Sequence, residues 1–171
     1  MDNVILVNLQ KVAKSFGGSI ELVTQEEYKK FHTDECHDIY DAPFTSADLS
    51  IVWKQKKIIF TKENEPTWPD IVHEMGHVFG CMDSERPGKE KSESGFFGWE
   101  YLLVKQIGAP IAEWEQGNDI YCAYFEQTTE FGDLTKGQQE RFIQECIDEG
   151  VAKGNIRKYK KGKYKILSLR S

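Results

Sequence analysis

The pentapeptide from His73 to His77 carries the residues of this chain that are best suited to chemistry. It reads His-Glu-Met-Gly-His, so two imidazoles stand four residues apart with a carboxylate between them. Residues four apart share one face of an α-helix, which lets His73 and His77 contact one metal ion. Two histidines, a third protein ligand and an open position make a hydrolytic zinc site. Glu74 lies one step around the helix, where its carboxylate can act as a base on water instead of binding the metal.

The sequence around the pentapeptide predicts the helix that this arrangement needs. Thr67 is a suitable N-cap, Pro69 is tolerated in the first helical turn, and Asp70 stands three residues after the cap. The histidines and Glu74 lie off an apolar stripe, where a cleft would give a substrate access to them. The stripe has helical spacing and consists of Ile71, Met75, Val78, Phe79 and Met82.

The third metal ligand is expected to be a carboxylate that follows the motif. No histidine follows His77, and the upstream His32 and His37 lie in a polar stretch typical of surface histidines. Glu100 is the best candidate because it lies in the middle of an otherwise apolar face of a predicted helix. An ionised carboxylate there is unfavourable unless it is paired or bound to metal. The apolar residues of that face are Phe96, Leu103, Val104 and Ile107.

Alternatives to a zinc-binding Glu100 remain open. Three carboxylates lie nearer the motif, in a charged and turn-rich stretch typical of a surface loop. They are Glu85, Glu90 and Glu93. Glu93 is the alternative ligand because it lies closest to the start of the apolar helix. Glu100 would be structural if it formed a salt bridge with a buried Lys or Arg.

With these residues in place, the chain resembles the gluzincin-type metallopeptidases, in which HExxH is followed by a glutamate on the next helix. Within that group it is most similar to the compact ImmA/IrrE-like proteins of bacteria and their phages, over roughly residues 51–110. The resemblance implies a small α+β, zincin-like domain whose antiparallel sheet packs on an HExxH helix and a Glu-bearing helix. It also implies zinc-dependent hydrolysis of a protein or peptide substrate, such as a regulatory protein.

The resemblance implies two further parts of the catalytic apparatus. An edge strand beside the metal helix would hold the substrate backbone through main-chain hydrogen bonds. The predicted hairpin at residues 51–61 is placed for that role, and the alternative is that it forms ordinary strands of the sheet. A proton donor to the oxyanion is also expected, for which Tyr101, Tyr121 and Tyr124 are equal candidates.

Local patterns predict most of the remaining secondary structure. The predicted helices cover residues 4–16, 25–31 and 135–154, and the predicted strands cover residues 19–24, 50–53 and 57–61, the last two as a hairpin. Residues 111–114 and 120–125 are apolar enough to pack on the core.

Composition indicates one compact domain followed by a basic segment. At 171 residues and 39% hydrophobic content, the chain can bury a core without disulfides. No run approaches the roughly twenty apolar residues that a membrane helix needs, and the N-terminal residues lack the pattern of a secretory signal. We therefore expect a cytoplasmic protein without membrane contact. Its scattered cysteines are expected to be reduced thiols: Cys36, Cys81, Cys122 and Cys146.

The C-terminal segment differs from the rest of the chain in charge. Residues 155–171 carry seven Lys and Arg and no acid, whereas residues 1–154 carry 15 Lys and Arg against 28 Asp and Glu. We therefore divide the chain into a zincin-like metallopeptidase domain at 1–154 and a basic tail or hairpin at 155–171, with a turn at Lys161-Gly162. The basic segment either contacts an acidic or nucleic-acid partner, or lies against the acidic body, or is a solvated tail.

Two classes of function follow from these patterns. The first is a zinc-dependent endopeptidase of a bacterium or phage, in which His73, His77 and Glu100 hold zinc while Glu74 is the base. The second is a non-catalytic interaction protein on the same scaffold, which binds a protein or nucleic acid through the basic segment. Glu74 favours the enzyme, because a scaffold that needed only the metal would have no chemical use for it.

Overall fold

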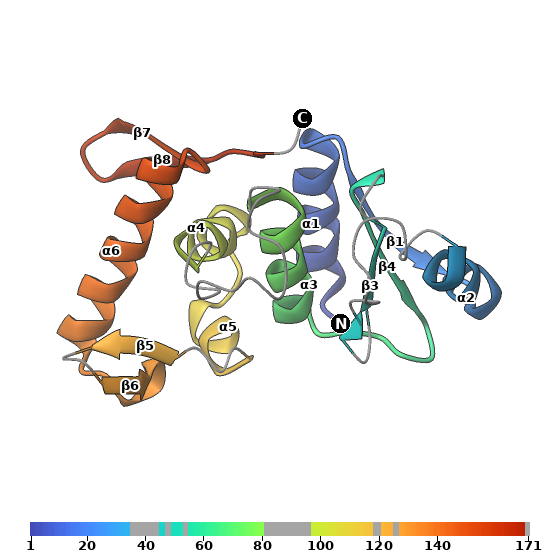
Figure 1. The fold of residues 1–171 in the computed structure, drawn as a ribbon, viewed down its shortest axis with the longest axis horizontal. Helices are drawn as coiled ribbons and strands as arrows, with labels where there is room; N and C mark the ends of the chain where they lie inside the picture. The colour runs from blue at the N-terminus through green and yellow to red at the C-terminus, as the bar shows by residue number, and fades with distance from the viewer. Residues whose placement is uncertain are drawn as a thin grey trace. The chain divides into compact units, whose positions relative to one another are not determined.

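The computed structural model describes residues 1–34, 45–46, 49–52, 55–80, 97–117, 121–124 and 127–169 (Figure 1). They belong to two compact units, residues 1–79 and residues 80–170, each of which is described by itself. Helices and small sheets both occur, so the predicted α+β class is confirmed. Within the described ranges, no helix has the length and apolar character needed to span a bilayer.

The first unit contains a mixed four-stranded sheet. Its strands lie in the order β1 (Ser19–Val23), β4 (Lys57–Thr61), β3 (Leu49–Val52) and β2 (Thr45–Ser46). β3 and β4 are antiparallel, which confirms the predicted hairpin, and β2 is antiparallel to β3. β1 runs parallel to β4, so the prediction of an antiparallel sheet is wrong for this pair. A parallel pair needs a long crossover, and the chain between β1 and β4 is long enough to provide it.

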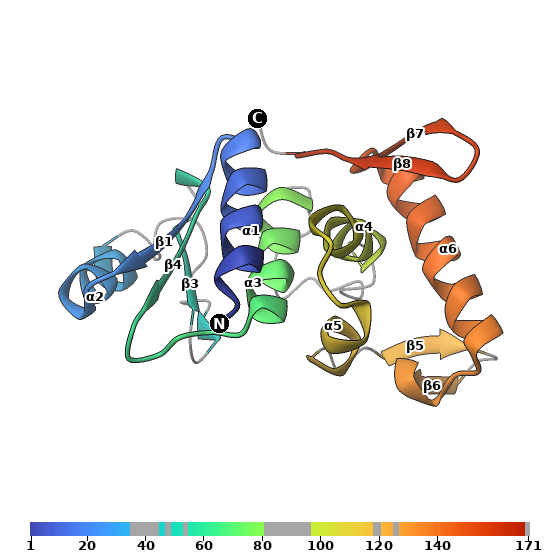
Figure 2. The same cartoon turned by 180° about the vertical axis from the view of Figure 1, so that it is seen from behind.

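Helices cover both faces of this sheet (Figures 1 and 2). α1 (Asn3–Ser15) and α3 (Trp68–Met75) lie side by side along one face, and α2 (Gln25–Asp34) lies along the other. A strand covered on both sides has no solvent face to keep polar. β4 agrees with this rule, because four consecutive residues of it are buried. The sheet thus gives α3 a rigid apolar support.

The hairpin of β3 and β4 lies inside the sheet and not at its edge. β4 pairs with β1 on one side and with β3 on the other, and β2 pairs with Leu49 and Ser50 of β3. Among the described strands, β1 and β2 are therefore the edges. The expectation that this hairpin offers an edge to a substrate is wrong, because β1 already uses the backbone groups of β4 on that side. The alternative, ordinary strands of the sheet, is confirmed.

The second unit is mainly helical and has an aromatic core of its own. The Phe97 ring centroid lies 4.8 Å from that of Trp114, 5.6 Å from Phe142 and 5.7 Å from Phe131, so rings from four elements meet. The elements of this unit are α4 (Phe97–Ile107), α5 (Ile111–Gly117), β5 (Tyr121–Tyr124), β6 (Gln127–Glu130), η4 (Phe131–Asp133), α6 (Lys136–Lys153), β7 (Ile156–Lys160) and β8 (Lys163–Ile166).

α6 begins and ends where the sequence predicts. The Thr135 side chain caps its first turn, and Gly154 ends it with φ 92°, a left-handed conformation that favours glycine. The next residue, Asn155, is buried, and its Nδ2 donates a hydrogen bond of 2.9 Å to the carbonyl oxygen of Gly80. This side chain therefore ties the end of α6 to the first residue of the second unit.

The predicted terminal hairpin forms directly after Asn155. β7 and β8 are antiparallel, with Ile156 opposite Ile166 and with a left-handed Gly162 in the turn. Both isoleucines are buried, and β7 contacts α6 while β8 contacts α4. Trp99 of α4 donates a hydrogen bond of 3.0 Å from Nε1 to the carbonyl oxygen of Leu167, just after β8. The hairpin is thus a packed part of the second unit at its base.

The close crossing of α4 and α6 at Gly98 yields a test of the second unit. A Cβ atom at Gly98 would lie 2.7 Å from the carbonyl carbon of Cys146 and 2.7 Å from the nitrogen of Ile147, and this backbone cannot easily move. We expect Gly98→Ala to lower the free energy of unfolding by about 1–3 kcal/mol. Chemical denaturation followed by circular dichroism measures the change.

The matched control is Gly137→Ala in the first turn of α6, where a Cβ atom would meet nothing within 4 Å. This variant should be neutral or more stable by up to about 1 kcal/mol, because alanine favours the helix over glycine. Equal stability of the two variants would show that the helices do not cross at Gly98.

Candidate metal centre

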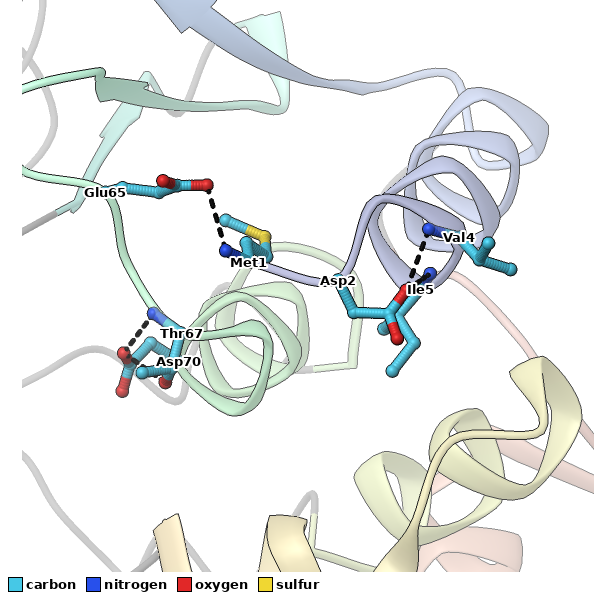
Figure 3. Close-up of polar contacts among 7 residues, drawn as sticks. All are labelled: Met1, Asp2, Val4, Ile5, Glu65, Thr67 and Asp70. Atoms are coloured by element: carbon cyan, nitrogen blue, oxygen red, sulfur yellow. Dashed lines mark hydrogen bonds and ion pairs between the residues drawn. The ribbon is translucent and has the colours of Figure 1, made fainter.

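The helix that carries HExxH is fixed at its start by hydrogen bonds and an ion pair (Figure 3). The backbone N–H of Thr67 donates a hydrogen bond of 2.9 Å to the Asp70 carboxylate. The side chain of the third helical residue thus reaches back to the N-cap residue, as in a capping box. Two residues before Thr67, Glu65 forms an ion pair of 3.3 Å with the amino group of Met1. Asp2 then caps the first turn of α1. The first residues of α1 and of α3 are therefore both fixed by polar contacts, and the Met1–Glu65 ion pair joins the two helix starts.

One face of α3 is anchored in the apolar core. The buried residues of that face are Trp68, Ile71, Val72 and Met75, and the following Val78 and Phe79 are fully buried as well. The Phe79 ring lies against Gly18, where a side chain would collide with it, and against the ring of Phe16 at a centroid distance of 5.4 Å. This packing holds the helix in place so that its polar residues keep a fixed position.

The hydrogen-bonding pattern of the helix changes inside the motif. The α-helix ends at Met75, and a π-helical turn, η2, follows over Gly76–Gly80. The sequence predicted regular α-helical spacing as far as Met82, which lies outside the described residues. In a π-turn, each N–H bonds five residues back, so the turn holds an extra residue. Such turns occur frequently at functional sites, and His77 lies within this one.

His73 and His77 face each other across this change of pattern. Their Nε2 atoms lie 3.2 Å apart, and their ring planes are almost perpendicular at 89°. Two nitrogens that each lie about 2.0–2.1 Å from a tetrahedral zinc ion are about 3.3–3.4 Å apart. The observed pair fits such an ion, and the same distance also allows one imidazole to donate a hydrogen bond to the other. The predicted approach of the two side chains is therefore observed.

The motif combines two buried groups with one that is more open to solvent. Glu74 is 3% exposed and His77 is 8% exposed, whereas His73 is half-buried. Ionisable groups at such depth require polar or ionic partners, because transfer of a lone charge from water to an apolar interior is strongly unfavourable. The partial exposure of His73 leaves one side of the pair accessible.

Glu100 is buried as predicted, with an exposure of 3%. It lies in the first turn of α4, where the positive end of the helix dipole also favours a carboxylate. Glu100 belongs to the second unit and the histidines belong to the first. The structure therefore brings together two of the predicted ligands, and no group of three or more potential metal ligands occurs among the residues that it describes. The role of Glu100 as third ligand stays a prediction.

Several other candidates lie outside what the structure describes. These are the alternative ligands Glu85, Glu90 and Glu93, together with His37, Cys36 and Cys81. Only the backbone is described for another four, which are His32 in α2 and Tyr121, Cys122 and Tyr124 in β5. Cys146 is buried and belongs to no disulfide within the part of the chain that the structure describes.

Tyr101 is the candidate proton donor whose side chain the structure describes. Burial raises its pKa above the usual value, and the charges of Glu115 and Glu140 raise it further. The phenol therefore keeps its proton at neutral pH and can donate a hydrogen bond. Tyr101 lies one residue after Glu100 and hence about 100° around the helix. Its ring contacts Trp114 and Lys105, and it lines a groove formed with α6 and the terminal hairpin.

Similarity to known proteins adds no residue to this site. No protein-family model, no curated protein and no solved structure matches the chain. The candidate metal centre consists of the imidazoles of His73 and His77 and the buried carboxylate of Glu74, with Glu100 as its predicted partner.

The first test of this centre is its metal content. The purified protein should hold about one zinc ion per chain, and His77→Ala should lose most of it, because one imidazole of the pair is removed. Elemental analysis after gel filtration measures the occupancy. His32→Ala serves as the matched control and should keep the zinc of the wild type. Full occupancy in His77→Ala would remove His77 from the ligand set.

The third ligand is tested by comparison of two glutamates. Glu100→Ala should weaken zinc binding, because Glu100 is a buried carboxylate as expected of a ligand, whereas Glu93→Ala should leave it nearly unchanged. Competition with a chromophoric chelator measures both affinities. The opposite ranking would move the ligand into the segment before α4 and leave Glu100 with a structural role.

Proposed function

We propose that this protein is a zincin-like, zinc-dependent metalloendopeptidase that hydrolyses peptide bonds of a protein substrate. The observation that carries the proposal is the pair of imidazoles in η2 and α3, with Nε2 atoms 3.2 Å apart and the buried Glu74 carboxylate on the same helix. The resemblance of the motif and its surroundings to the ImmA/IrrE-like peptidases supports the same reaction. A regulatory protein is the expected kind of substrate.

Each residue of the proposed site has a separate role. His73 and His77 would bind the ion through their Nε2 atoms, and Glu100 would complete the protein ligands. The chemistry supplied by the bound ion would be polarisation of the scissile carbonyl and a pKa of about 7 for its water. The packing of α3 on the sheet would keep both imidazoles in place, so that binding the ion requires little rearrangement.

Glu74 would transfer the proton that peptide hydrolysis moves from water to the leaving amine. Its carboxylate would accept a proton from the attacking water and then pass it to the leaving amine. Glu74 is next to His73 in the sequence but out of register with the imidazole pair, which suits a base that acts beside the metal. Its burial keeps bulk water away from the carboxylate, so that its contacts with the reacting groups are less screened.

A peptide substrate would bind along an edge of the sheet. β1 has five residues and β2 has two, so β1 offers the longer of the two described edges. Main-chain hydrogen bonds along such an edge hold an extended peptide without reading each side chain. The proposal therefore moves substrate binding from the β3–β4 hairpin to an edge strand.

A second function, that of an interaction protein, is favoured by a different observation. The terminal hairpin presents six Lys and Arg side chains that are all exposed. A binding function of this surface would not need the metal and would be compatible with peptidase activity elsewhere in the chain.

The deciding experiment separates chemistry from metal binding. Glu74→Gln keeps the size of the side chain and a hydrogen-bonding group, but it removes the basic carboxylate. The variant should fold and keep its zinc, while its rate of peptide cleavage should fall about 10²–10⁴-fold, the usual contribution of a positioned base. Cleavage of a broad peptide library, followed by mass spectrometry, measures the rate.

The control for this experiment is the wild-type protein from a parallel preparation, with zinc content determined on both samples. If the wild type cleaved nothing and Glu74→Gln kept the full biological effect, the peptidase proposal would fail. The protein would then be assigned the interaction function.

A further inference from the structure

The terminal hairpin presents an unusual concentration of uncompensated positive charge. Within residues 156–166, here called the basic hairpin, six side chains are cationic, none is acidic and all six cations are exposed. They are Arg157, Lys158, Lys160, Lys161, Lys163 and Lys165. No ion pair joins any of them to a carboxylate in the part of the chain that the structure describes. The hairpin packs through its apolar residues and leaves its charge in solvent.

The pairing of the two strands places like charges against each other. Arg157 stands directly opposite Lys165, and Lys160 stands directly opposite Lys163. Like charges in such cross-strand positions destabilise a hairpin, whereas opposite charges would stabilise it. The apolar pair of Ile156 and Ile166 at the base counteracts this repulsion. A polyanion laid along the hairpin would relieve the repulsion, which gives the surface a physical preference for such a partner.

Aromatic side chains accompany the cations. Tyr159 lies between Lys158 and Lys160 and is 58% exposed, so much of its ring is available to a partner. Tyr164, opposite Lys158, is half-buried, and its hydroxyl accepts a hydrogen bond of 3.0 Å from Nε2 of Gln144. One tyrosine is therefore held in place while the other is open to solvent.

A groove lies between the basic hairpin, α4 and α6. Its volume is about 760 Å³, within the range of about 300–1,000 Å³ that is typical of ligand sites. Its charged residues are three lysines and one glutamate, so its lining is net positive. Residues that could contact a ligand there include Tyr101, Lys105, Gln106, Tyr159, Lys163 and Tyr164. Figures 1 and 2 show the hairpin beside the C-terminal end of α6, whose last residue is Lys153.

We propose that the basic hairpin and this groove bind single-stranded nucleic acid. The cations would pair with successive phosphates, and unstacked bases would stack on Tyr159 and enter the groove beside Tyr101 and Tyr164. Basic grooves with aromatic platforms are the usual means of binding single strands without sequence preference. A duplex would use the cations but would keep its bases away from the tyrosines, and an acidic peptide would likewise use charge alone. The single strand is the partner that uses both features.

The binding test uses the full chain and fluorescence anisotropy with labelled oligothymidylate and oligouridylate of about 20 nucleotides, a length that covers one binding site. Binding of either single strand is expected, and its affinity should fall as salt rises, because released counterions drive the association. Binding of neither strand, or equally tight binding of a duplex or of polyglutamate, would overturn the proposal.

Charge variants test the contribution of the hairpin. Lys160→Ala combined with Lys163→Ala should weaken binding at least about tenfold at low salt and reduce the slope of log affinity against log salt by about 1.4, or 0.7 for each lost contact. The two lysines repel each other, so their removal should not unfold the hairpin. The matched control is Lys11→Ala combined with Lys14→Ala on α1, which makes the same change in charge. An equal loss in this control would show only a non-specific effect of net charge.

Tyrosine variants test the stacking. Tyr159→Ala should weaken binding about 5- to 150-fold, the effect of losing one stacked base, whereas Tyr159→Phe should bind like the wild type. A Tyr159→Ala variant with unchanged affinity would overturn the role of the aromatic platform. Thermal unfolding of both variants should match the wild type, because the exposed ring contributes little to the core.

Discussion

Burial of ionisable side chains on a helix that is anchored in an apolar core is the constraint on which the first unit depends. Glu74 and His77 are almost inaccessible to solvent on a helix whose other face is packed by fully buried Ile71 and Val72. Such burial is unfavourable unless the groups have polar or ionic partners, and the helix must hold the groups beside those partners. The hydrogen bond at Thr67, the support of β4 and the contact with α1 keep the helix in position. A hydrolytic site requires the same rigidity, because its groups must be positioned before the substrate arrives.

The π-helical turn lies where the helix carries both a buried imidazole and two residues of the apolar core. The residues after Met75 include two apolar side chains of the core and the imidazole that lies beside His73. With η2 in the helix, Val78 and Phe79 are fully buried and His77 lies against His73. Glycine at Gly76 and Gly80 makes the departure from α-helical geometry less difficult, because it has no Cβ atom. The same turn therefore accommodates both the core residues and the imidazole of the candidate site.

The second unit also buries one carboxylate, but it leaves a cluster of cations exposed. Glu100 is buried at the start of α4, beside the aromatic core around Phe97, whereas the cations of the basic hairpin all remain in solvent. The hairpin keeps its place through Ile156, Ile166 and the bond from Trp99, so its surface is left available for a partner. A buried carboxylate suits a metal, and exposed cations suit a polyanion. The second unit thus combines a buried carboxylate with an exposed cationic surface, and the two proposed functions do not depend on each other.

The sequence by itself determined the features that depend on neighbouring residues. The cap at Thr67, the ends of α6 at Thr135 and Gly154, the turn at Gly162 and the approach of two histidines four apart all follow from local geometry. Only the tertiary structure decided that β1 pairs parallel to β4, that the β3–β4 hairpin is internal, and that η2 interrupts the helix. Strand partners and helix distortions depend on competition between distant segments for the same backbone groups and core space, and a local pattern of residues carries no signal of that competition.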